Sequence, residues 1–193
     1  MRAASNPPEV GTVRRLRRSF FARPSTTVAP ELLNKLLVTD RSVGRIVEVE
    51  AYMQDDPASH AFHGQTRRNA TMFGPAGVLY VYFTYGMHHC ANVVTGSIGD
   101  GQAVLLRAVT PVTGIEQLRA RRPGRADRSL ADGPAKLCQA FGLDLSHDGL
   151  DLCVDGSPVW LGDDGMPPPD APHVGRRVGI SVGIELPWRW RAR

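Results

Sequence analysis

The stretch that decides the fold is RIVEVEAYMQDDPASHAFHG, residues 45–64. Its first half alternates with a period of two, as a β-strand does. The alternation predicts one mostly polar face, made of Ile46, Glu48, Glu50 and Tyr52, and one apolar face, made of Val47, Val49 and Ala51. Two carboxylates and a tyrosine at one strand end, with His60 and His63 following, make this end a candidate site. Exposed strand faces also carry paired glutamates, so context has to decide.

Length and composition bound the class of protein. At 193 residues with 42% hydrophobic residues, the chain suits one globular domain. We expect a flexible tail over residues 1–13 and a single domain over residues 14–193. No apolar run approaches the roughly 18 residues of a membrane span. The first residues, MRAASNPPEV, lack the apolar core of a secretion signal. The expected location is therefore the cytoplasm.

Cysteine spacing and charge further limit the kinds of site that the chain can contain. The three cysteines lie far apart without a CxxC pair, so neither a disulfide framework nor a zinc site is expected. There are 23 basic and 19 acidic residues, a net charge of +4, and all but two of the basic residues are arginine. Arginine suits bidentate contacts with phosphate. A coding bias would give the same composition, so the placement of the arginines has to decide.

Hydrophobic periodicity and turn residues predict a single compact α+β domain, with a largely antiparallel curved β-sheet and flanking helices. The expected strands cover residues 44–52, 78–84, 89–94, 103–109, 157–161 and 176–184. The expected helices cover residues 30–37, 114–120 and 133–141. The arginine-rich segment RARRPGRADRS, which begins at Arg119, is expected to be mobile.

Glu48 and Glu50 are the first candidates for chemistry. Two residues apart on a strand, their backbones lie roughly 6.5–7 Å apart. That distance is close to the carboxylate separation of inverting glycoside hydrolases, which hold a water between an acid and a base. His60 and His63 lie in a loop with no further ligands at suitable offsets, so no metal site is expected.

Aromatic and basic residues interleave further along the chain. In VLYVYFTYGM, residues 78–87, Tyr80 and Tyr82 share one strand face, and Tyr85 comes just before the turn at Gly86. Cross-strand packing explains the first two, but a tyrosine at a turn tip buries little. Basic residues flank these elements at Arg67, Arg68, Arg107 and the arginines of residues 119–128. Arginines that hold phosphate, beside rings that stack on or wedge between bases, indicate nucleic-acid binding.

Seven motifs in one order carry a resemblance to a known family. They are IVEVEAY, ASH, TRRNATMF, LYVYFTYGMHHCANVV, DGQAVLLRAVTP, GPAKLCQAFG, and RVGIS with PWRW. In these motifs the chain resembles the alkyladenine (3-methyladenine) DNA glycosylase family, monofunctional enzymes that excise alkylated purines. The resemblance runs from LRRSFFARP near residue 16 to LPWRW near residue 190. The chain departs from the family pattern at Asn34, where LLGK is usual, and in lacking an aromatic segment after PWRW.

The resemblance implies roles for the residues around the strand end. Glu50 corresponds to the general base that activates the water attacking the sugar. Tyr52 and His60 correspond to walls between which the flipped purine stacks, and Tyr82 closes the other side. Glu48 is expected to support the site without being catalytic.

The resemblance also implies contacts with DNA. Tyr85 corresponds to a tyrosine wedged into the minor groove, which fills the stack that the flipped base leaves. Asn92 corresponds to a residue that disfavours the amino group of guanine. Arg107 corresponds to a basic residue near the sugar-phosphate backbone. Further backbone contacts are expected from Arg67, Arg68 and Lys136.

The function that the resemblance implies is physically coherent. A base inside a duplex is out of reach, so the nucleotide must be extruded at a cost of a few kcal/mol. An alkylated purine is cationic and leaves readily, and an aromatic cage attracts it by roughly 0.5–2 kcal/mol. The expected protein is a monomer that acts on alkylated or deaminated purines in double-stranded DNA and needs no cofactor. Strand cleavage by a lyase route needs an amine, and besides its N-terminus the chain has only Lys35 and Lys136, so base release without strand cleavage is expected.

Two other functions stay open at this point. A damaged-DNA-binding protein without chemistry would keep the pocket, but it would have no use for the Glu50 carboxylate. A carbohydrate hydrolase would use Glu48 and Glu50 as its catalytic pair, but the basic surroundings disfavour it.

Overall fold

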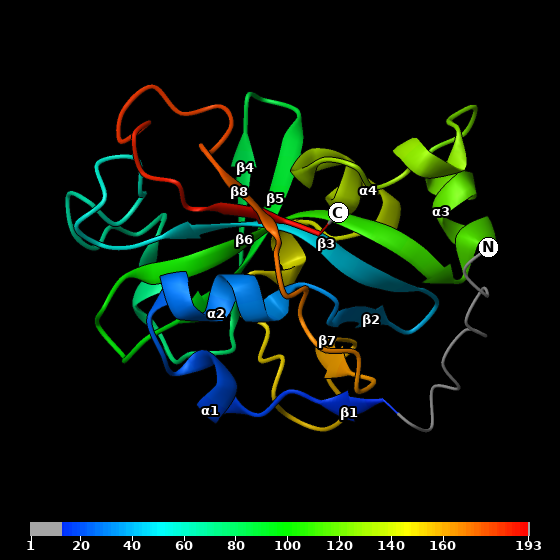
Figure 1. Cartoon of the computed structure of the whole chain (residues 1–193), viewed down its shortest axis with the longest axis horizontal. Helices are drawn as coiled ribbons and strands as arrows, with labels where there is room; N and C mark the ends of the chain where they lie inside the picture. The colour runs from blue at the N-terminus through cyan, green and yellow to red at the C-terminus, as the bar shows by residue number, and fades with distance from the viewer. Residues whose placement is uncertain (1–12, 193) are drawn as a thin grey trace.

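One antiparallel sheet organises the domain (Figure 1). The computed structural model describes residues 13–192. In this range the strands are β1 (Arg14–Arg15), β2 (Leu36–Thr39), β3 (Val43–Tyr52), β4 (Leu79–Thr84), β5 (His88–Thr95), β6 (Gln102–Thr113), β7 (Val159–Asp163), β8 (His173–Gly175) and β9 (Arg189–Arg191). Their order is β1-β7-β2-β3-β6-β5-β4, and β9 pairs with both β3 and β8. Strand β3 therefore lies at the centre, with β6 on one side and with β2 and β9 on the other.

Short helices pack against this sheet. Helix α2 (Ser25–Leu32) contacts β3 and β6, and helix α4 (Pro134–Phe141) contacts β5 and β6. The other helical elements of the described chain are α1 (Arg18–Phe21), α3 (Ile115–Arg121) and the 3₁₀ turns η2 (Ala70–Phe73), η3 (Asp127–Ser129) and η4 (Leu145–His147). The predicted α+β domain with an antiparallel sheet and flanking helices is confirmed.

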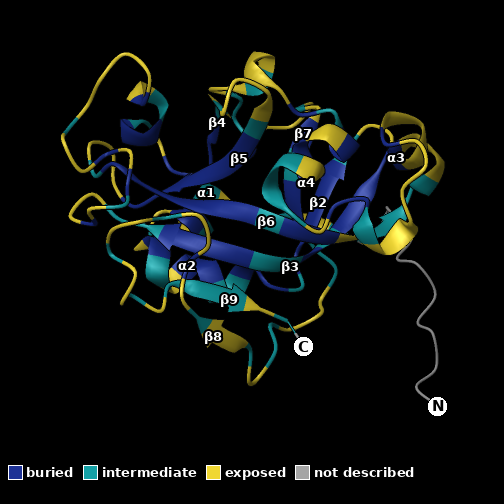
Figure 2. Cartoon of the chain, turned by 90° about the horizontal axis from the view of Figure 1, so that it is seen from above, coloured by how far each residue is buried: buried dark blue, intermediate teal, exposed yellow. Residues whose placement is uncertain are grey.

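The main core lies between the helices and the central strands. Buried residues run along β3, β5 and β6 in Figure 2. Leu32 of α2, Phe141 of α4 and Leu106 of β6 belong to one apolar cluster. Strand β4 has two buried sides, because Leu79 enters this cluster while Tyr80 enters a smaller one. Each large apolar side chain buried here contributes roughly 1.5–3 kcal/mol.

The pairing of β3 with β6 contains an irregularity that matters for the site. The register shifts on both sides of Glu48, and the successive partners are Ile46–Val109, Glu48–Ala108, Val49–Leu106 and Glu50–Leu105. Val47 in β3 and Arg107 in β6 are each left without a partner in this ladder. Such bulges bend a strand and redirect its side chains.

The bulge corrects the face assignment drawn from strict alternation. Ile46 is fully buried in the same cluster as Val49, while Val47 is only half-buried. The prediction that Ile46 shares the polar face was therefore wrong, because one extra residue between Ile46 and Glu48 reverses the order of faces. Beyond the bulge, Glu48 and Glu50 do lie on one side, where both contact Arg107.

Two expected elements differ from the structure. The helix predicted at residues 30–37 is instead the end of α2 followed by strand β2. Leu33 is extended and Asn34 has a φ of 68°, so the helix ends there. Leu36 and Leu37 are fully buried in β2 between β3 and β7. Pairing within the sheet thus overrides the local helical spacing of the leucines.

The strand predicted at residues 176–184 is a loop between β8 and β9. Gly179 and Gly183 have φ values of 79° and 60°, which interrupt an extended run. The other predicted strands, and the helices at 114–120 and 133–141, are confirmed within a few residues. The tail predicted at residues 1–13 lies, apart from Val13, outside the described residues. No helix in the range 13–192 has the length and apolar character to cross a bilayer.

Candidate active site

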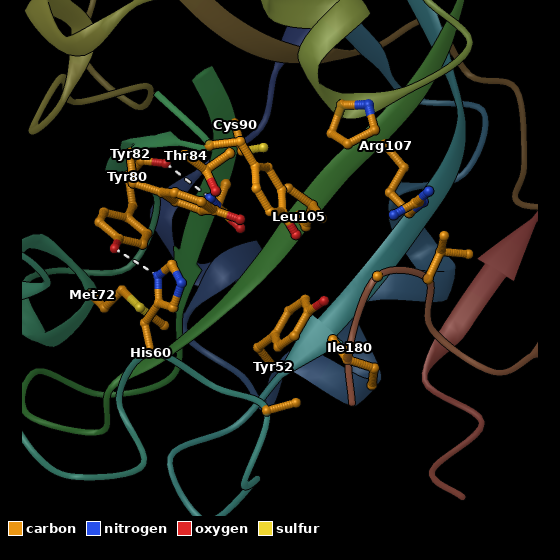
Figure 3. A pocket seen from close by; sticks show the side chains of 16 residues that line it. Tyr52, His60, Met72, Tyr80, Tyr82, Thr84, Cys90, Leu105, Arg107 and Ile180 are labelled. Atoms are coloured by element: carbon orange, nitrogen blue, oxygen red, sulfur yellow. Dashed lines mark hydrogen bonds between the residues drawn. The ribbon is translucent and has the colours of Figure 1, made fainter. Parts of the chain in front are cut away.

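A cavity of about 350 Å³ opens at the carboxyl end of β3 (Figure 3). Segments far apart in the sequence form its wall. They include Tyr52 at the end of β3, His60 in the loop that follows, Tyr82 in β4 and Arg107 in β6. Residues 178–180, from the loop after β8, complete one side. The curved sheet brings these side chains together, because β3, β6, β5 and β4 are consecutive neighbours.

Aromatic rings form one wall of the cavity. The His60 and Tyr82 rings are 4.5 Å apart and nearly perpendicular. The Nδ1 atom of His60 lies 3.0 Å from the hydroxyl of Tyr80. Both tyrosines reach this side because alternate residues of β4 point the same way. In Figure 3 the Tyr52 ring faces the same space from a separate strand. Electron-rich rings thus stand on more than one side of the opening.

The Glu50 carboxylate lies behind this wall and is fully buried. Its Oε1 atom accepts a hydrogen bond from the Val178 backbone N–H at 2.8 Å and lies 3.2 Å from Nη1 of Arg107. Its Oε2 atom accepts from the Tyr52 hydroxyl at 2.9 Å. All three partners line the cavity, although Glu50 itself does not. Glu50 thus has two hydrogen bonds and one ion pair, and a carboxylate offers roughly four acceptor positions.

Arg107 joins the two glutamates of β3. Its Nε atom donates to Glu48 at 3.0 Å, while its Nη1 atom is the one beside Glu50. Glu48 also lies 3.3 Å from Arg189 of β9. The Arg107 side chain is only 12% exposed. The bulge at Arg107 lets its guanidinium reach both carboxylates, so Arg107 bridges the pair.

Burial shifts the pKa values of the ionisable groups around the cavity. It raises the pKa of Glu50 above the ordinary 4.5, although Arg107 and the two hydrogen-bond donors oppose the shift. It raises the pKa of Tyr52 far above the usual range for tyrosine, and the Glu50 charge adds to this effect. It lowers the pKa of His60, which Arg68 lowers further. The cavity therefore holds neutral rings at physiological pH.

Asn92 of β5 is buried and lines the cavity. Its Nδ2 atom donates to the backbone oxygen of Tyr80 at 3.1 Å, which fixes the orientation of the amide. Cys90, two residues earlier on the same strand, also lines the cavity. Both positions face inward because β5 pairs with β4 in register, Asn92 opposite Tyr80 and Cys90 opposite Tyr82.

Tyr85 forms the tip of the β4–β5 hairpin at the rim of the cavity and is 80% exposed. The Met87 N–H donates to the Thr84 oxygen at 3.2 Å, which closes a four-residue β-turn over residues 84–87. The two central residues, Tyr85 and Gly86, have φ values of 50° and 66°. Positive φ at both positions is the type I′ geometry, which favours asparagine, aspartate or glycine. Tyrosine at the first position is therefore strained, and strain of this kind clusters at functional sites.

Of the four basic residues predicted to contact DNA, Arg107 lines the cavity, whereas Arg67, Arg68 and Lys136 lie outside its wall. Arg67 and Arg68 are exposed, and Arg68 donates to the Phe83 oxygen near the hairpin tip at 3.0 Å. Lys136 lies in the first turn of α4, two residues after Pro134, which lines the cavity. Its ammonium group pairs with Asp132 at 2.7 Å.

The arginine-rich segment of residues 119–129, which begins in the last turn of α3, is partly neutralised by local ion pairs. Arg119 pairs with Asp127 at 2.7 Å and also contacts Glu116. Arg121 donates to the Ala140 oxygen of α4 at 3.1 Å. Within residues 13–192, no group of three or more His, Cys, Asp or Glu side chains is placed to hold a metal ion.

Comparison with known proteins identifies the family. The family described as methylpurine-DNA glycosylase (MPG) matches residues 19–193. The chain belongs to the methylpurine-DNA glycosylase family. It is 53% identical over 192 residues to a protein of Burkholderia cenocepacia named "Putative 3-methyladenine DNA glycosylase", covering 98% of this chain and 92% of that protein.

Proteins of two other bacteria carry the same name. One from Rhodopseudomonas palustris is 49% identical over 181 residues, with 93% of this chain and 88% of that protein covered. One from Carboxydothermus hydrogenoformans is 48% identical over 180 residues, with 91% of this chain and 93% of that protein covered. The match therefore spans nearly the whole of each protein.

In this member of the methylpurine-DNA glycosylase family, the structure adds groups to the site that the sequence reasoning did not assign. They are the Tyr80 hydroxyl, Cys90 and the Val178 backbone N–H. Alternation in β4 and β5 could have placed the first two on the side of Tyr82 and Asn92. Nothing local could have indicated the Val178 amide, because it reaches Glu50 across 128 residues of sequence.

The strained turn gives a first prediction. Replacing Tyr85 with Asn should stabilise the free protein by roughly 1 kcal/mol, since a left-handed conformation costs most L-residues about 1–2 kcal/mol and asparagine less. The same substitution should impair base excision, because it removes the exposed ring. Denaturant unfolding and an excision assay measure the two effects. A loss of stability would show that the ring packs in the free protein.

Proposed function

We propose that this protein is a monofunctional DNA glycosylase that flips alkylated or deaminated purines out of duplex DNA. It then hydrolyses the N-glycosidic bond with a water activated by Glu50. The observation that carries the proposal is a fully buried carboxylate whose contacts all line an aromatic-walled cavity, with an exposed tyrosine at the rim. The family match supports the same class of activity. We also propose that the protein acts as a monomer, on DNA in the cytoplasm.

The chemistry of the wall suits a cationic purine. Tyr52, His60 and Tyr82 present electron-rich rings, and a positive ring between them gains cation–π attraction. A neutral His60 does not repel such a base, and burial keeps the imidazole neutral by lowering its pKa. Asn92, with its amide held by Tyr80, would meet the edge of the base and disfavour the amino group of guanine.

Glu50 can serve as the general base because one acceptor position remains for a water. Its Oε1 atom contacts Val178 and Arg107, and its Oε2 atom accepts only from Tyr52. A carboxylate kept in a dry site binds the proton of an attacking water more strongly than one in bulk solvent. Its negative charge would also stabilise the positive charge that develops on the sugar.

Contacts outside the cavity would hold the DNA. Tyr85 at the hairpin tip would fill the stack that the flipped nucleotide leaves, as wedge residues do in kinked duplexes. Arg67, Arg68 and Lys136 would contact the phosphates. Arg107 is only 12% exposed and bridges two carboxylates, so its place is beside the reacting sugar rather than along the outer backbone.

The Arg107 bridge also distinguishes the alternatives. A two-carboxylate hydrolase keeps the space between its carboxylates for a water. Here the Arg107 guanidinium occupies that space and contacts both Glu48 and Glu50. A binding protein without chemistry would gain nothing from burying an ionisable group behind its pocket, because desolvating a charge is costly.

The central test removes the proposed base. Glu50→Gln should lower excision from methylated duplex DNA by roughly 100- to 10,000-fold, the usual contribution of a general base, while binding stays intact or tightens. Glu48→Gln is the matched control. It should lower excision much less than Glu50→Gln does, because Glu50 keeps its three contacts. Single-turnover release of methylpurines measures both variants. Equal losses would instead favour the two-carboxylate mechanism.

The pH dependence of excision follows from the raised pKa of Glu50. The base must be ionised, so the rate should fall as the pH drops through that pKa, with a midpoint above 4.5. Tyr52→Phe keeps the ring but removes the hydroxyl that donates to Glu50, so the midpoint should rise further. Single-turnover rates across pH measure both midpoints. A wild-type midpoint at or below 4.5 would contradict the role of a buried base.

The protein should release the base without cutting the DNA strand. Lys35 is buried and pairs with Asp163 at 2.9 Å, and Lys136 pairs with Asp132, so neither ammonium group is placed as a nucleophile in the cavity. Borohydride treatment during the reaction should therefore trap no covalent adduct with DNA. An adduct that forms with the wild type and disappears in Lys136→Arg would identify a lyase.

A further inference from the structure

A buried ion pair lies behind the cavity and outside its wall. The side chains of Arg177 and Asp56 are both fully buried. The pairing is bidentate, with Nη1 donating to Oδ2 and Nη2 donating to Oδ1, the latter at 2.8 Å. A buried bidentate pair is geometrically specific, and burying the two charges has a large desolvation cost. The proposed reaction, as described above, uses neither residue.

The pair fixes three separate stretches of backbone. Arg177 donates to the backbone oxygen of Ala51 in β3 at 3.1 Å and to that of Gly183 in the loop after β8 at 3.3 Å. Asp56 accepts from the Ala58 N–H at 3.0 Å, in the loop after β3. One ion pair therefore connects the end of β3 with the two loops that border the cavity.

The same guanidinium covers a ring of the cavity wall. Its Cζ atom lies 4.6 Å from the centre of the Tyr52 ring and 5.4 Å from that of Trp188. Stacking against a planar cation restricts the tilt of an aromatic ring. The tilt of Tyr52 in turn decides where its hydroxyl lies, and that hydroxyl is 2.9 Å from Glu50.

Arg177 also precedes the residue that supplies the backbone contact to Glu50. The Val178 N–H donates to Glu50 at 2.8 Å, and the peptide bond that carries it begins at Arg177. Anchoring the Arg177 side chain therefore holds this amide in place. Two of the three contacts on Glu50 come from groups that Arg177 restrains, and the third comes from Arg107.

We propose that Arg177 and Asp56 are positioning residues for base excision, because their buried pair holds the Tyr52 ring and the Val178 amide where these groups orient Glu50. The inference rests on the proposed role of Glu50 as the base. Neither member of the pair needs to touch the DNA or the reacting atoms.

Loss of this restraint has a defined effect on Glu50. Hydrogen bonds to a carboxylate favour its ionised form, so weaker donation from Tyr52 and Val178 raises the pKa of Glu50. In the pH profile of the excision rate, the fall on the acidic side then occurs at a higher pH. The other titratable and charged groups around Glu50 are Arg107 of β6, Glu48 of β3, Arg189 of β9 and Cys90 of β5, together with Arg177 itself. The test variants leave the first four unchanged.

The test replaces Arg177 with Lys. A lysine keeps the positive charge beside Asp56, but it lacks the planar fork that reaches three acceptors and stacks on a ring. We expect single-turnover excision to fall by roughly tenfold to a hundredfold, since misplacement by about 1 Å can cost that much. Binding to methylated duplex DNA should change little.

Arg45→Lys is the matched control. Arg45 lies in β3, forms a bidentate pair with Asp164 at 2.7 and 3.3 Å, and donates to a backbone oxygen at 2.7 Å, as Arg177 does with Asp56 and Ala51. It contacts neither Tyr52 nor Glu50. The control should therefore excise at the wild-type rate, even if it loses a similar amount of stability.

A second readout does not depend on activity. In protein labelled with ¹³C at the glutamate carboxyls, the Glu50 signal is assigned with Glu50→Gln and titrated in each variant. The pKa of Glu50 should rise in Arg177→Lys and stay unchanged in Arg45→Lys. An unchanged Glu50 pKa in folded Arg177→Lys overturns the inference, whatever the excision rate does. If Arg177→Lys does not fold, Asp56→Asn is titrated instead, with the same criterion.

The two readouts separate this inference from the proposed function. If the wild type releases no methylpurine but the Glu50 pKa still rises in Arg177→Lys, the proposed function fails and the restraint on Glu50 stands. If the wild type excises and neither its rate nor the Glu50 pKa changes in the variant, the proposed function stands and the positioning role fails.

Discussion

The rest of the site depends on burying one carboxylate. Glu50 is fully excluded from solvent, and a charge in that position must be compensated by hydrogen bonds and opposite charge. The compensation comes from β6 through Arg107, from β3 through Tyr52 and from the loop after β8 through Val178. These groups also form the cavity wall, so the contacts that make the buried charge tolerable are the ones that shape the pocket. Stability and the proposed chemistry therefore share one set of interactions.

The paired irregularities in β3 and β6 make this arrangement possible. In a regular ladder, Arg107 would lie opposite a residue of β3 and its direction would follow from alternation alone. The unpaired position instead lets its guanidinium reach both Glu48 and Glu50. Arg189 contributes a second positive charge from β9. The result is a compact group of two carboxylates and two guanidiniums, in which Arg107 contacts both Glu48 and Glu50.

Rigidity and strain are distributed unevenly around the cavity. The back of the pocket is held by buried ion pairs and by backbone hydrogen bonds from separate segments. The rim, by contrast, carries an exposed tyrosine in an unfavourable backbone conformation at the end of a hairpin. Such a division suits a protein that must hold a reacting group still while presenting a ring to a large partner. The strain at Tyr85 is tolerated because the pairing of β4 with β5 fixes the turn.

The sequence by itself determined the class of fold, most of the strands and the motifs that identify the family, because alternation, turn residues and residue order are local properties. It also indicated Glu50, Tyr52, Tyr82 and Tyr85 as candidates, through their strand and turn positions and their motifs. The tertiary structure alone decided that leucines 36 and 37 form a strand, that Ile46 faces the core, and that residues 176–184 form a loop. It alone brought the Val178 amide to the Glu50 carboxylate and the Arg177 guanidinium to the Tyr52 ring. These outcomes depend on strand register and on contacts across more than 100 residues, and local patterns hold no information about either.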